Sequence, residues 1–235
     1  INDITILNKL GFIPIIIHGG GKRISNKLNE SGIKSNFIDG LRVTDEKSIK
    51  IVEEVLNIFN REIINALKNN GCDSEGITNK NKNILTVSQE NTSLGFVGSP
   101  KEIKQSIIEQ IVKEKKVPVI APLGLDENNQ VFNINADTAA GSVAKKLSAR
   151  RLIIMSDVEG VMDNNKKLIS EISTNKINEL IKDKTISGGM IVKIQNCSDV
   201  VRNGVKGVCI IDGRLDHSIL FELLSDKGSG TLIRL

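Results

Sequence analysis

The chain has 235 residues, of which 39% are hydrophobic and 26% are charged, with a formal net charge of +4. This length and composition are typical of a globular protein with one large domain or two lobes. The basic residues are spread along the chain and only 3% of the residues are aromatic, which argues against nucleic acid as a partner. No apolar stretch reaches membrane-spanning length and no export signal is recognised, so neither a membrane partner nor export is expected.

The three cysteines, Cys72, Cys197 and Cys209, lie far apart in the sequence and form no CxxC pair. With only His18 and His217 as further soft ligands, a structural zinc site is not expected. This cysteine usage predicts a reduced, cytoplasmic protein without a metal site of its own.

The chain opens on Ile1, and Asn2–Leu10 has the pattern of the end of an amphipathic helix, so the sequence is expected to begin within a longer protein. An apolar strand is predicted at Ile13–Ile17, and the run His18, Gly19, Gly20, Gly21 follows it. Glycines between a strand and a helix leave backbone N–H groups open to phosphate oxygens, which makes this turn a candidate phosphoryl cradle. Taken alone, such a turn serves packing as often as ligand binding.

The glycine turn does not match the common nucleotide fingerprints. Lys22 follows the glycines directly, which excludes GxxxxGK[ST], and Ile24 occupies the position of the third glycine of GxGxxG. An HGGG run also forms the oxyanion hole of some esterases, but no serine stands in a GxSxG sequence here. P-loop, Rossmann and serine hydrolase sites are therefore not predicted.

Arg42 lies in a short extended segment just before a predicted helix. A guanidinium there can bind a carboxylate through two parallel hydrogen bonds, although a surface arginine is the commoner case. Asp45 is predicted to cap a helix that extends to about Asn70. The apolar residues of this helix recur at helical spacing and are assigned to the core rather than to a cofactor site: Ile49, Val52, Leu56, Phe59, Ile63 and Leu67.

Short alternating runs between Ile84 and Ser99 predict β-hairpins, which either close over a ligand as a flap or extend the edge of a sheet. A buried strand is predicted at Val117–Ala121. The polar cluster Asn133–Ala140 starts a helix rich in small residues. Asp137 in this cluster is either an N-cap or a functional group.

Two further polar segments stand at ends of predicted elements. The first follows a strand at Leu152–Met155, at the end where open α/β sheets bind ligands, although a turn with acidic capping residues is the alternative. It contains Asp157, Val158, Glu159, Gly160, Val161 and Met162. The second, Ser187, Gly188 and Gly189, precedes a helix with Lys193 on its first turns. A lysine near a helix start opposes the helix dipole, which favours function over structure.

Four continuous aliphatic runs, the last at Val208–Ile211, alternate with helical patterns. Such runs suit strands buried on both faces, so the chain is predicted to form an α/β sandwich around a mainly parallel sheet. A boundary near Leu147–Arg151 divides it into an N-terminal lobe, residues 1–147, and a C-terminal lobe, residues 148–235.

Taken together and in this order, the segments resemble the amino acid kinase family, most closely its members that phosphorylate N-acetyl-L-glutamate in arginine biosynthesis. The resemblance implies a three-layer αβα sandwich with an amino-acid lobe followed by a nucleotide lobe. It covers nearly the whole chain, and several ordered motifs are far more specific than any one. The matching segments are His18–Gly21, Asp39–Asp45, Leu94–Gly98, Asn133–Ala140, Ser156–Val161, Ser187–Lys193, Ile211–Arg214 and Gly228–Thr231.

The resemblance also implies roles for residues near the acceptor. Gly20 and Gly21 would donate backbone hydrogen bonds to the transferring phosphoryl group, and Arg42 and Asn133 would hold N-acetyl-L-glutamate. The flap at Leu94–Gly98 would close over that substrate. Phosphoryl transfer of this kind relies on positioning and charge neutralisation rather than on covalent participation by the protein.

For the nucleotide, the resemblance implies that ATP is bound by Asp157–Met162 and Ser187–Gly189. Lys193 would neutralise charge on the transferring group, and Asp137 would orient the catalytic lysines. Mg²⁺ would be held largely by the ATP phosphates. The family begins with a strand that carries a second lysine and a glycine pair. Nothing before Ile13 supplies that strand, so the first strand is expected to be missing and the chain alone to be inactive or severely impaired. Losing one preorganised charge at a transition state costs about 3 kcal/mol or more.

The tail from His217 to Thr231, with Glu222, Gly228 and Gly230, resembles the C-terminal signature of arginine-inhibited members of the family. This implies arginine as a feedback inhibitor and a homo-oligomer, either a dimer or a hexamer. Two alternatives stay open: a related kinase that acts on another small carboxylate, such as carrier-bound aminoadipate, and a non-catalytic regulatory relative that binds without turnover.

Overall fold

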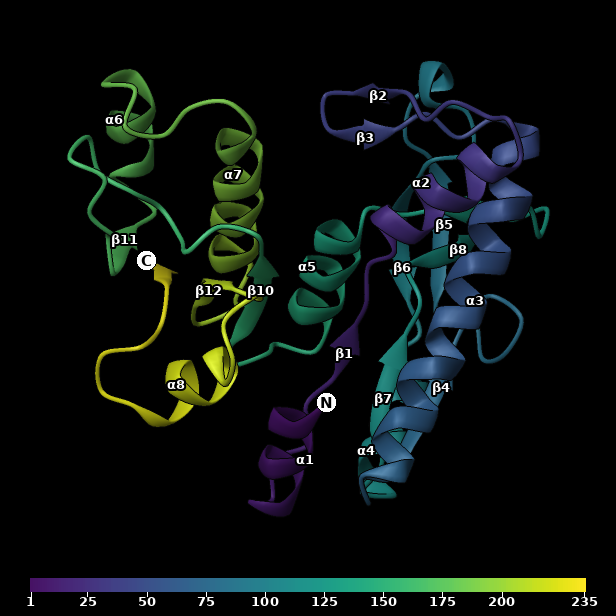
Figure 1. Cartoon of the computed structure of the whole chain (residues 1–235), viewed down its shortest axis with the longest axis horizontal. Helices are drawn as coiled ribbons and strands as arrows, with labels where there is room; N and C mark the ends of the chain where they lie inside the picture. Colours follow the sequence, from purple (N-terminus) through teal and green to yellow (C-terminus); the bar gives the residue numbers. More distant parts are fainter. The chain divides into compact units, whose positions relative to one another are not determined.

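The computed structural model describes all 235 residues (Figure 1). They form two compact units, Ile1–Ala139 and Ala140–Leu235. The division falls within helix α5 (Ala136–Lys146), whereas the predicted lobe boundary lies just after this helix. The lobes 1–147 and 148–235, with their separate substrate roles, stay a prediction.

A parallel three-stranded sheet forms the centre of the first unit. Its strands are, in spatial order, β1 (Ile16–Ile17), β7 (Val117–Ile120) and β4 (Ser74–Ile77). The central strand β7 is buried along its whole length, as its aliphatic run predicts. β1 is shorter than the predicted strand Ile13–Ile17, because Pro14 has no N–H group to offer a neighbouring strand.

Helices α1 (Asn2–Lys9), α3 (Glu46–Asn69) and α4 (Gln105–Lys113) pack on this sheet. Leu67 of α3 belongs to one core cluster with Val117 and Val119 of β7, and Ile4 of α1 packs against it. Ile120 points to the opposite face of the sheet, since side chains alternate along a strand, and it is also fully buried. The sheet is therefore a middle layer, buried on both faces.

Helix α3 begins where the sequence predicts. Asp45 is its N-cap, and the Asp45 carboxylate accepts a hydrogen bond from the Ser48 N–H at 2.7 Å. Hydrogen bonds to the charged form keep the pKa of Asp45 below its ordinary value. In the predicted apolar stripe, the buried side chains are Ile49, Val52, Leu56 and Leu67. The half-buried ones are Phe59 and Ile63.

Antiparallel hairpins recur in the first unit. The first joins β2 (Phe37–Ile38) to β3 (Leu41–Arg42). The second joins β5 (Leu85–Gln89) to β6 (Gly98–Ile103) through the short 3₁₀ helix η1 (Thr92–Leu94), so the hairpin predicted between Ile84 and Ser99 is confirmed. β5 and β6 continue into a four-stranded sheet with β8 (Leu123–Leu125) and β9 (Val131–Asn133).

The second unit is built on a mixed four-stranded sheet. Its strands are, in spatial order, β10 (Leu152–Ser156), β12 (Val208–Asp212), β13 (Thr231–Arg234) and β11 (Glu171–Ser173). β10 and β12 are parallel, and Ser156 pairs with Asp212 at their carboxyl ends. The helices of this unit are α6 (Ile177–Lys182), α7 (Gly189–Arg202) and α8 (Ser218–Leu224).

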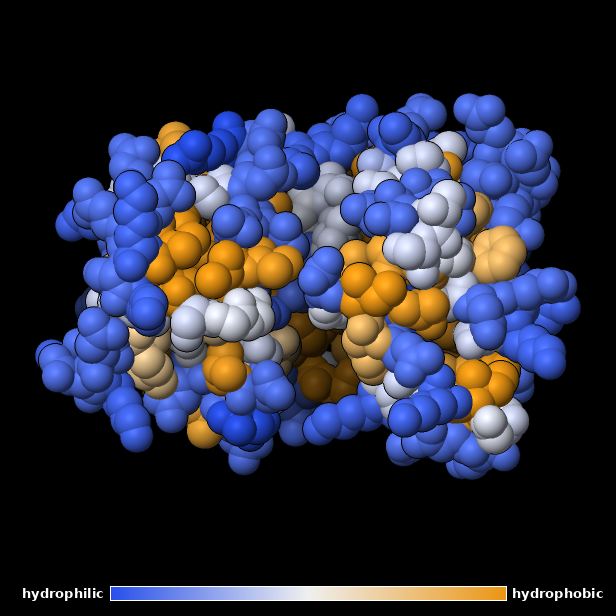
Figure 2. Space-filling model, turned by 90° about the horizontal axis from the view of Figure 1, so that it is seen from above, coloured by the Kyte–Doolittle hydropathy of each residue, from blue (hydrophilic) through white to orange (hydrophobic).

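The predicted fold class, an α/β three-layer αβα sandwich around a mainly parallel sheet, is confirmed, because buried parallel strands alternate with covering helices along the chain. The surface is mainly hydrophilic and is interrupted by apolar groups (Figure 2). Exposed apolar side chains include Phe37 and Ile38 on the β2–β3 hairpin and Phe221 and Leu224 on α8. None of the helices combines the length and the apolar character needed to cross a bilayer.

Candidate active site

A pocket of about 220 Å³ opens in the first unit beyond the carboxyl ends of β1 and β7. This is the edge of a parallel sheet where α/β proteins bind ligands. The volume suits a small metabolite, since sites for drug-sized ligands span about 300–1,000 Å³. Four predicted site residues line the pocket together: Gly20, Gly21, Arg42 and Asn133.

The glycine turn leads directly into helix α2 (Gly21–Glu30). Gly20 is the N-cap, no side chain caps the helix, and no acidic residue stands in its first turn. The first N–H groups of α2 therefore lack intrahelical acceptors, and the positive end of the helix dipole lies beside the pocket. A Cβ on Gly20 would lie 2.7 Å from Leu56 Cδ2, so any larger residue would require this leucine side chain of α3 to shift. The turn has the features of an anion cradle.

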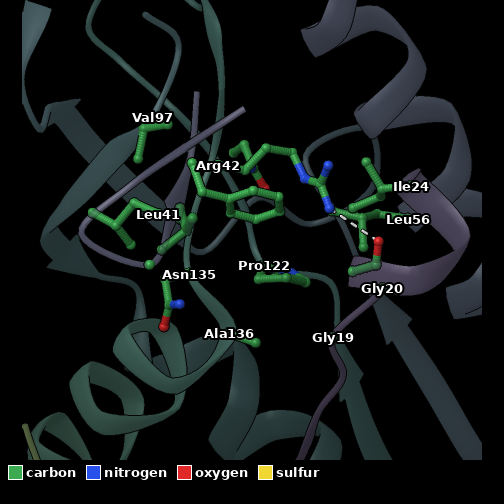
Figure 3. A pocket seen from close by; sticks show the side chains of 15 residues that line it. Gly19, Gly20, Ile24, Leu41, Arg42, Leu56, Val97, Pro122, Asn135 and Ala136 are labelled. Carbon is green, nitrogen blue, oxygen red and sulfur yellow. Dashed lines mark hydrogen bonds between the residues drawn. The ribbon is translucent and has the colours of Figure 1, made fainter. Parts of the chain in front are cut away.

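Arg42 is buried to 8% exposure and its guanidinium projects across the pocket toward the glycine turn (Figure 3). Nη1 donates a hydrogen bond to Ser35 Oγ at 2.6 Å, and Nη2 donates to Ser25 Oγ at 2.9 Å and to the Gly21 carbonyl at 3.0 Å. Its Cζ atom lies 4.7 Å from the centroid of the Phe37 ring.

All these hydrogen-bond acceptors of Arg42 are uncharged. Burial lowers the pKa of Arg42 from its ordinary value, because the charged form is poorly solvated there. An arginine nevertheless stays protonated in proteins and has five N–H donors, of which the three contacts leave two. The pocket thus contains a buried cation that an anionic ligand would neutralise.

Thr44 joins Arg42 to the flap and to Asn133. This residue is fully buried; its N–H donates to the Leu94 carbonyl at 2.9 Å, and its own carbonyl accepts from the Phe96 N–H at 2.7 Å. Thr44 Oγ1 donates to the Arg42 carbonyl at 2.9 Å, and Asn133 Nδ2 donates to Thr44 Oγ1 at 3.4 Å. The flap segment therefore lies on the pocket, where Val97 forms part of the wall.

The start of α5 also enters the pocket through Asn135 and Ala136 (Figure 3). Asn135 Oδ1 accepts the Thr138 N–H at 3.0 Å. The capping function that the sequence offers to Asp137 thus belongs to Asn135, and Asp137 lies in the first turn of the helix. This leaves the functional reading of Asp137 open to experiment.

In the second unit, the predicted nucleotide segment follows β10 directly. Asp157, Val158 and Glu159 are exposed, whereas Gly160 and Val161 are buried. Val161 N–H donates to Thr231 Oγ1 at 2.8 Å, which fixes the far end of the segment.

The carboxyl end of β12 carries a charged pair beside the same sheet edge. Arg214 donates to both carboxylate oxygens of Asp212, at 2.9 and 2.7 Å, and this pairing lowers the pKa of Asp212 to about 2. Asp157 and Glu159 add their negative charge to the field at Arg214 and help to raise its pKa.

Helix α7 carries the remaining predicted residues. Gly188 is its N-cap with a φ of +55°, a conformation that favours glycine, and no side chain caps the helix. Lys193 lies on the second turn, five residues after Gly188. Since α7 leads back into the parallel strand β12, its N-terminus belongs to the edge where β10 and β12 end.

Several of these features carry no signal in the sequence. Ser25 and Ser35 are ordinary polar residues until the fold places them on Arg42, and Phe37 and Leu41 contribute pocket wall from a hairpin of two-residue strands. His18 stood out in the glycine motif, but its contact with Asn60, 42 positions away, depends on tertiary packing. The structure has no cluster of three or more His, Cys, Asp or Glu side chains suited to a metal ion.

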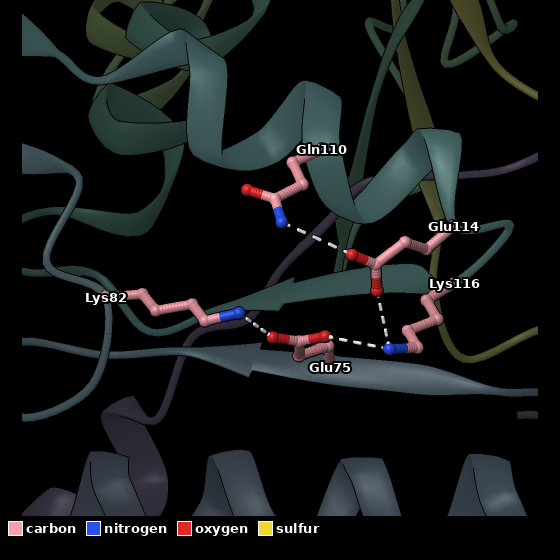
Figure 4. Close-up of polar contacts among 5 residues, drawn as sticks. All are labelled: Glu75, Lys82, Gln110, Glu114 and Lys116. Carbon is pink, nitrogen blue, oxygen red and sulfur yellow. Dashed lines mark hydrogen bonds and ion pairs between the residues drawn. The ribbon is translucent and has the colours of Figure 1, made fainter.

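A charged cluster lies at the opposite edge of the first sheet, near the amino ends of β4 and β7 (Figure 4). Glu75 accepts hydrogen bonds from Lys82 and, at 3.4 Å, from Lys116. Lys116 also pairs with Glu114 at 2.7 Å. Because it is remote in the sheet from the pocket, we assign this cluster to stability.

Replacing Glu75 with glutamine tests that assignment. The hydrogen bond from Lys82 is the main reason that the pKa of Glu75 lies below its ordinary value, so its stabilisation is present above the unfolded-state pKa and is lost as the pH falls through the lowered value. We expect urea unfolding of E75Q to show a loss of at most about 1 kcal/mol at neutral pH, since surface pairs are screened. The difference should begin to shrink near the ordinary glutamate pKa of about 4 and should close as the pH falls through the lowered pKa of Glu75. A difference of the same size at low pH would contradict this account.

Comparisons with known proteins agree with the fold and the motifs. Residues 1–212 match the Amino acid kinase family. An acetylglutamate kinase of Pelagibacter ubique (strain HTCC1062) is 64% identical over 234 residues, which cover 100% of this chain and 81% of that protein. An acetylglutamate kinase of Campylobacter hominis is 44% identical over 234 residues, covering 99% and 83% respectively.

A crystal structure of smu.665 from Streptococcus mutans UA159 superposes with a TM-score of 0.86 at 29% identity. The superposition covers 99% of this chain and 90% of that chain. The family motifs therefore occur on the same arrangement of helices and strands. The chain belongs to the amino acid kinase family and, within it, to the group of the acetylglutamate kinases.

Proposed function

We propose that the protein transfers the terminal phosphoryl group of ATP to the side-chain carboxylate of N-acetyl-L-glutamate. The products are N-acetyl-L-glutamyl 5-phosphate and ADP, and the reaction is the second step of arginine biosynthesis. The observation that carries the proposal is the pocket itself, in which a buried Arg42 with uncharged partners faces an uncapped helix N-terminus. The identity of 64% to an acetylglutamate kinase supports the choice of acceptor.

Arg42 and the glycine turn, which are joined by the hydrogen bond from Nη2 to the Gly21 carbonyl, both offer groups that suit the carboxylates of the acceptor. The free donors of Arg42 would bind one carboxylate, and Asn133 would add a hydrogen bond from the same side. The other carboxylate would then lie at the glycine turn, where the N–H groups of Gly20 and Gly21 would stabilise negative charge as the phosphoryl group arrives. Leu41, Leu56 and Val97 form apolar parts of the pocket wall and would exclude water.

The nucleotide segments of the second unit fit ATP by their chemistry. An uncapped helix start at Gly188 and Gly189 suits phosphate oxygens, and Asp157–Met162 would line the site at the strand ends. ATP supplies the phosphoryl group, together with Mg²⁺ held largely by its phosphates. Lys193 would neutralise charge during transfer, and Asp137 would orient the lysine. These assignments remain proposals.

Binding and turnover, measured separately, test the proposed function. Isothermal titration should show binding of N-acetyl-L-glutamate in preference to L-glutamate and aminoadipate. With MgATP, hydroxylamine should trap the acyl phosphate as a hydroxamate when the full-length protein that contains this chain is assayed, and the chain alone should yield much less. Turnover of aminoadipate by the full-length protein in preference to N-acetyl-L-glutamate would favour the related kinase. For the full-length protein, binding without turnover would favour a regulatory relative, and neither binding nor turnover would reject the proposal.

The proposed function also includes feedback inhibition by arginine. The protein is proposed to be a homo-oligomer and to be located in the cytoplasm. Glu222 organises the C-terminal tail, because its carboxylate accepts the Ser229 N–H at 2.9 Å and the Cys209 thiol at 2.7 Å. Burial and Glu222 together raise the pKa of Cys209 to about 12, so this thiol stays protonated. We expect L-arginine, but not D-arginine, to inhibit turnover. Equal inhibition by both enantiomers would reject a specific arginine site. Light scattering with and without L-arginine would report the oligomeric state.

A further inference from the structure

We propose that Asn60 and His18 form a chain of hydrogen bonds, called the relay below, that orients the Gly20 N–H toward the pocket. Both are then positioning residues for phosphoryl transfer. The inference rests on the proposed function, because it concerns the glycine turn of the same site. The relay runs from β7 through α3 to the end of β1. Neither side chain lines the pocket, so neither would touch the substrate.

The first step fixes the orientation of the Asn60 amide. Asn60 is 1% exposed, and its Nδ2 atom lies 2.9 Å from the Val119 carbonyl oxygen. A carbonyl oxygen only accepts hydrogen bonds, so the atom facing it must be the amide nitrogen rather than the amide oxygen. The same nitrogen lies 3.2 Å from Nε2 of His18. Asn60 is therefore a donor to His18.

The second step fixes the proton on His18. Because Nε2 accepts from Asn60, the single proton of a neutral imidazole must be on Nδ1. Nδ1 lies 2.9 Å from the Gly19 carbonyl oxygen, to which it then donates. Burial lowers the pKa of His18 and so favours the neutral ring, although the bond to Gly19 acts in the opposite direction.

The third step passes this orientation to the glycine turn. In a trans peptide the C=O of one residue and the N–H of the next point in opposite directions. Holding the Gly19 carbonyl toward His18 therefore turns the Gly20 N–H away from His18, and Gly20 lines the pocket. Gly20 N–H donates to no protein acceptor. Since the glycines have no side chains that could fix this peptide plane, the imidazole takes that role.

Packing holds the imidazole from a further direction. The Phe59 ring meets it edge-on, with centroids 5.2 Å apart. The guanidinium of Arg23 lies over the Phe59 ring, with Cζ 4.1 Å from the ring centroid. Arg23 also forms an ion pair with Glu62 at 2.7 Å. Helix α3 thus restrains His18 through two successive residues, Phe59 and Asn60. A misplacement of about 1 Å at a reacting group can cost about 100-fold in rate, so the loss of these contacts is expected to be visible in kcat.

Nuclear magnetic resonance tests the relay without requiring turnover. The chain has two histidines, so long-range ¹H–¹⁵N spectra of the ring nitrogens can be assigned with a single His217→Gln variant. We expect His18 to be neutral with the proton on Nδ1, and we expect Asn60→Leu to lose this single tautomer. A proton on Nε2 in the wild-type protein would overturn the relay.

Kinetics separate positioning from a structural role. We expect Asn60→Leu to lower kcat by about 10- to 100-fold while KM for N-acetyl-L-glutamate changes little, because the affected N–H serves the transferring group. Asn57→Leu is the matched control: Asn57 is a buried asparagine one turn earlier on α3 that bonds to the Glu53 carbonyl and Asn79 instead. Its kcat should stay near that of the wild type. Equal kcat values for the two variants would overturn the positioning role.

Two His18 variants keep the test independent of how Asn60→Leu folds. An asparagine amide nitrogen can occupy the place of Nδ1, whereas a glutamine amide nitrogen occupies the place of Nε2. His18→Asn should therefore retain more kcat than His18→Gln. The reverse order would contradict the relay. All kinetic variants are compared in the full-length protein that contains this chain. If that wild-type protein showed no turnover, the proposed function and the positioning role would both be rejected. Full turnover with the wrong tautomer would reject the relay alone.

Discussion

Replacing Arg42 with methionine is expected to lower kcat/KM for N-acetyl-L-glutamate by about 100-fold or more, since removing one partner of a buried, hydrogen-bonded charge pair costs about 2–5 kcal/mol. KM for ATP should change little. Lysine should restore little activity, because a single ammonium cannot contact Ser25, Ser35 and the Gly21 carbonyl as the guanidinium fork does. The hydroxamate assay over a range of acceptor concentrations measures the effect.

The control for Arg42 is Lys27→Met. Lys27 is a half-exposed cation on α2 that pairs with Glu30 at 3.4 Å and does not line the pocket. The Lys27→Met substitution removes a nearby positive charge without changing a residue that would contact N-acetyl-L-glutamate. If Arg42→Met kept kcat/KM within about threefold of the Lys27→Met value, the pocket would not be the carboxylate site.

Replacing Lys193 with methionine is expected to lower kcat by about 100- to 1,000-fold, the usual effect of removing one group that stabilises transition-state charge. The KM values for both substrates should change much less, because this charge is needed most during transfer. Single-turnover measurement of the acyl phosphate separates the chemical step from product release.

Lys206→Met serves as the control for Lys193. Lys206 is exposed in the short connection between α7 and β12, so its loss changes the net charge of the second unit equally without affecting the start of α7. We expect its kcat to match the wild type. A Lys193→Met protein whose KM for ATP rises while kcat is unchanged would show that this lysine binds nucleotide without serving the transfer.

The parts of this fold that follow from local physics could be predicted from the sequence. The Asp45 cap depends on a contact three residues away, and the β7 strand depends on its own aliphatic run. The order of the motifs pointed to the family and placed Gly20, Gly21, Arg42 and Asn133 in one expected site. In the structure, these four residues line one pocket.

The remainder depended on packing between distant segments. Nothing near Ser25 or Ser35 marks them as partners of Arg42, because the local sequence around a helix serine or a loop serine does not show which distant residue it contacts. Asp137 was the more obvious helix cap by composition, but Asn135 stands at the position where the side chain reaches the free N–H of Thr138. A shift of two residues in where the helix begins was enough to move that role.

Thr44 has a consequence for how acceptor preference changes between related enzymes. Its backbone holds the flap, its hydroxyl lies between Arg42 and Asn133, and a Cβ on Gly95 would overlap its carbonyl oxygen. Three segments that are far apart in the chain therefore meet at Thr44. The bonds between Thr44 and the flap are formed by the backbone, so a flap grafted from a relative with another acceptor could keep them whatever its side chains, provided that glycine stays at position 95. A new acceptor preference could thus arise from side-chain changes in the flap while this glycine is retained.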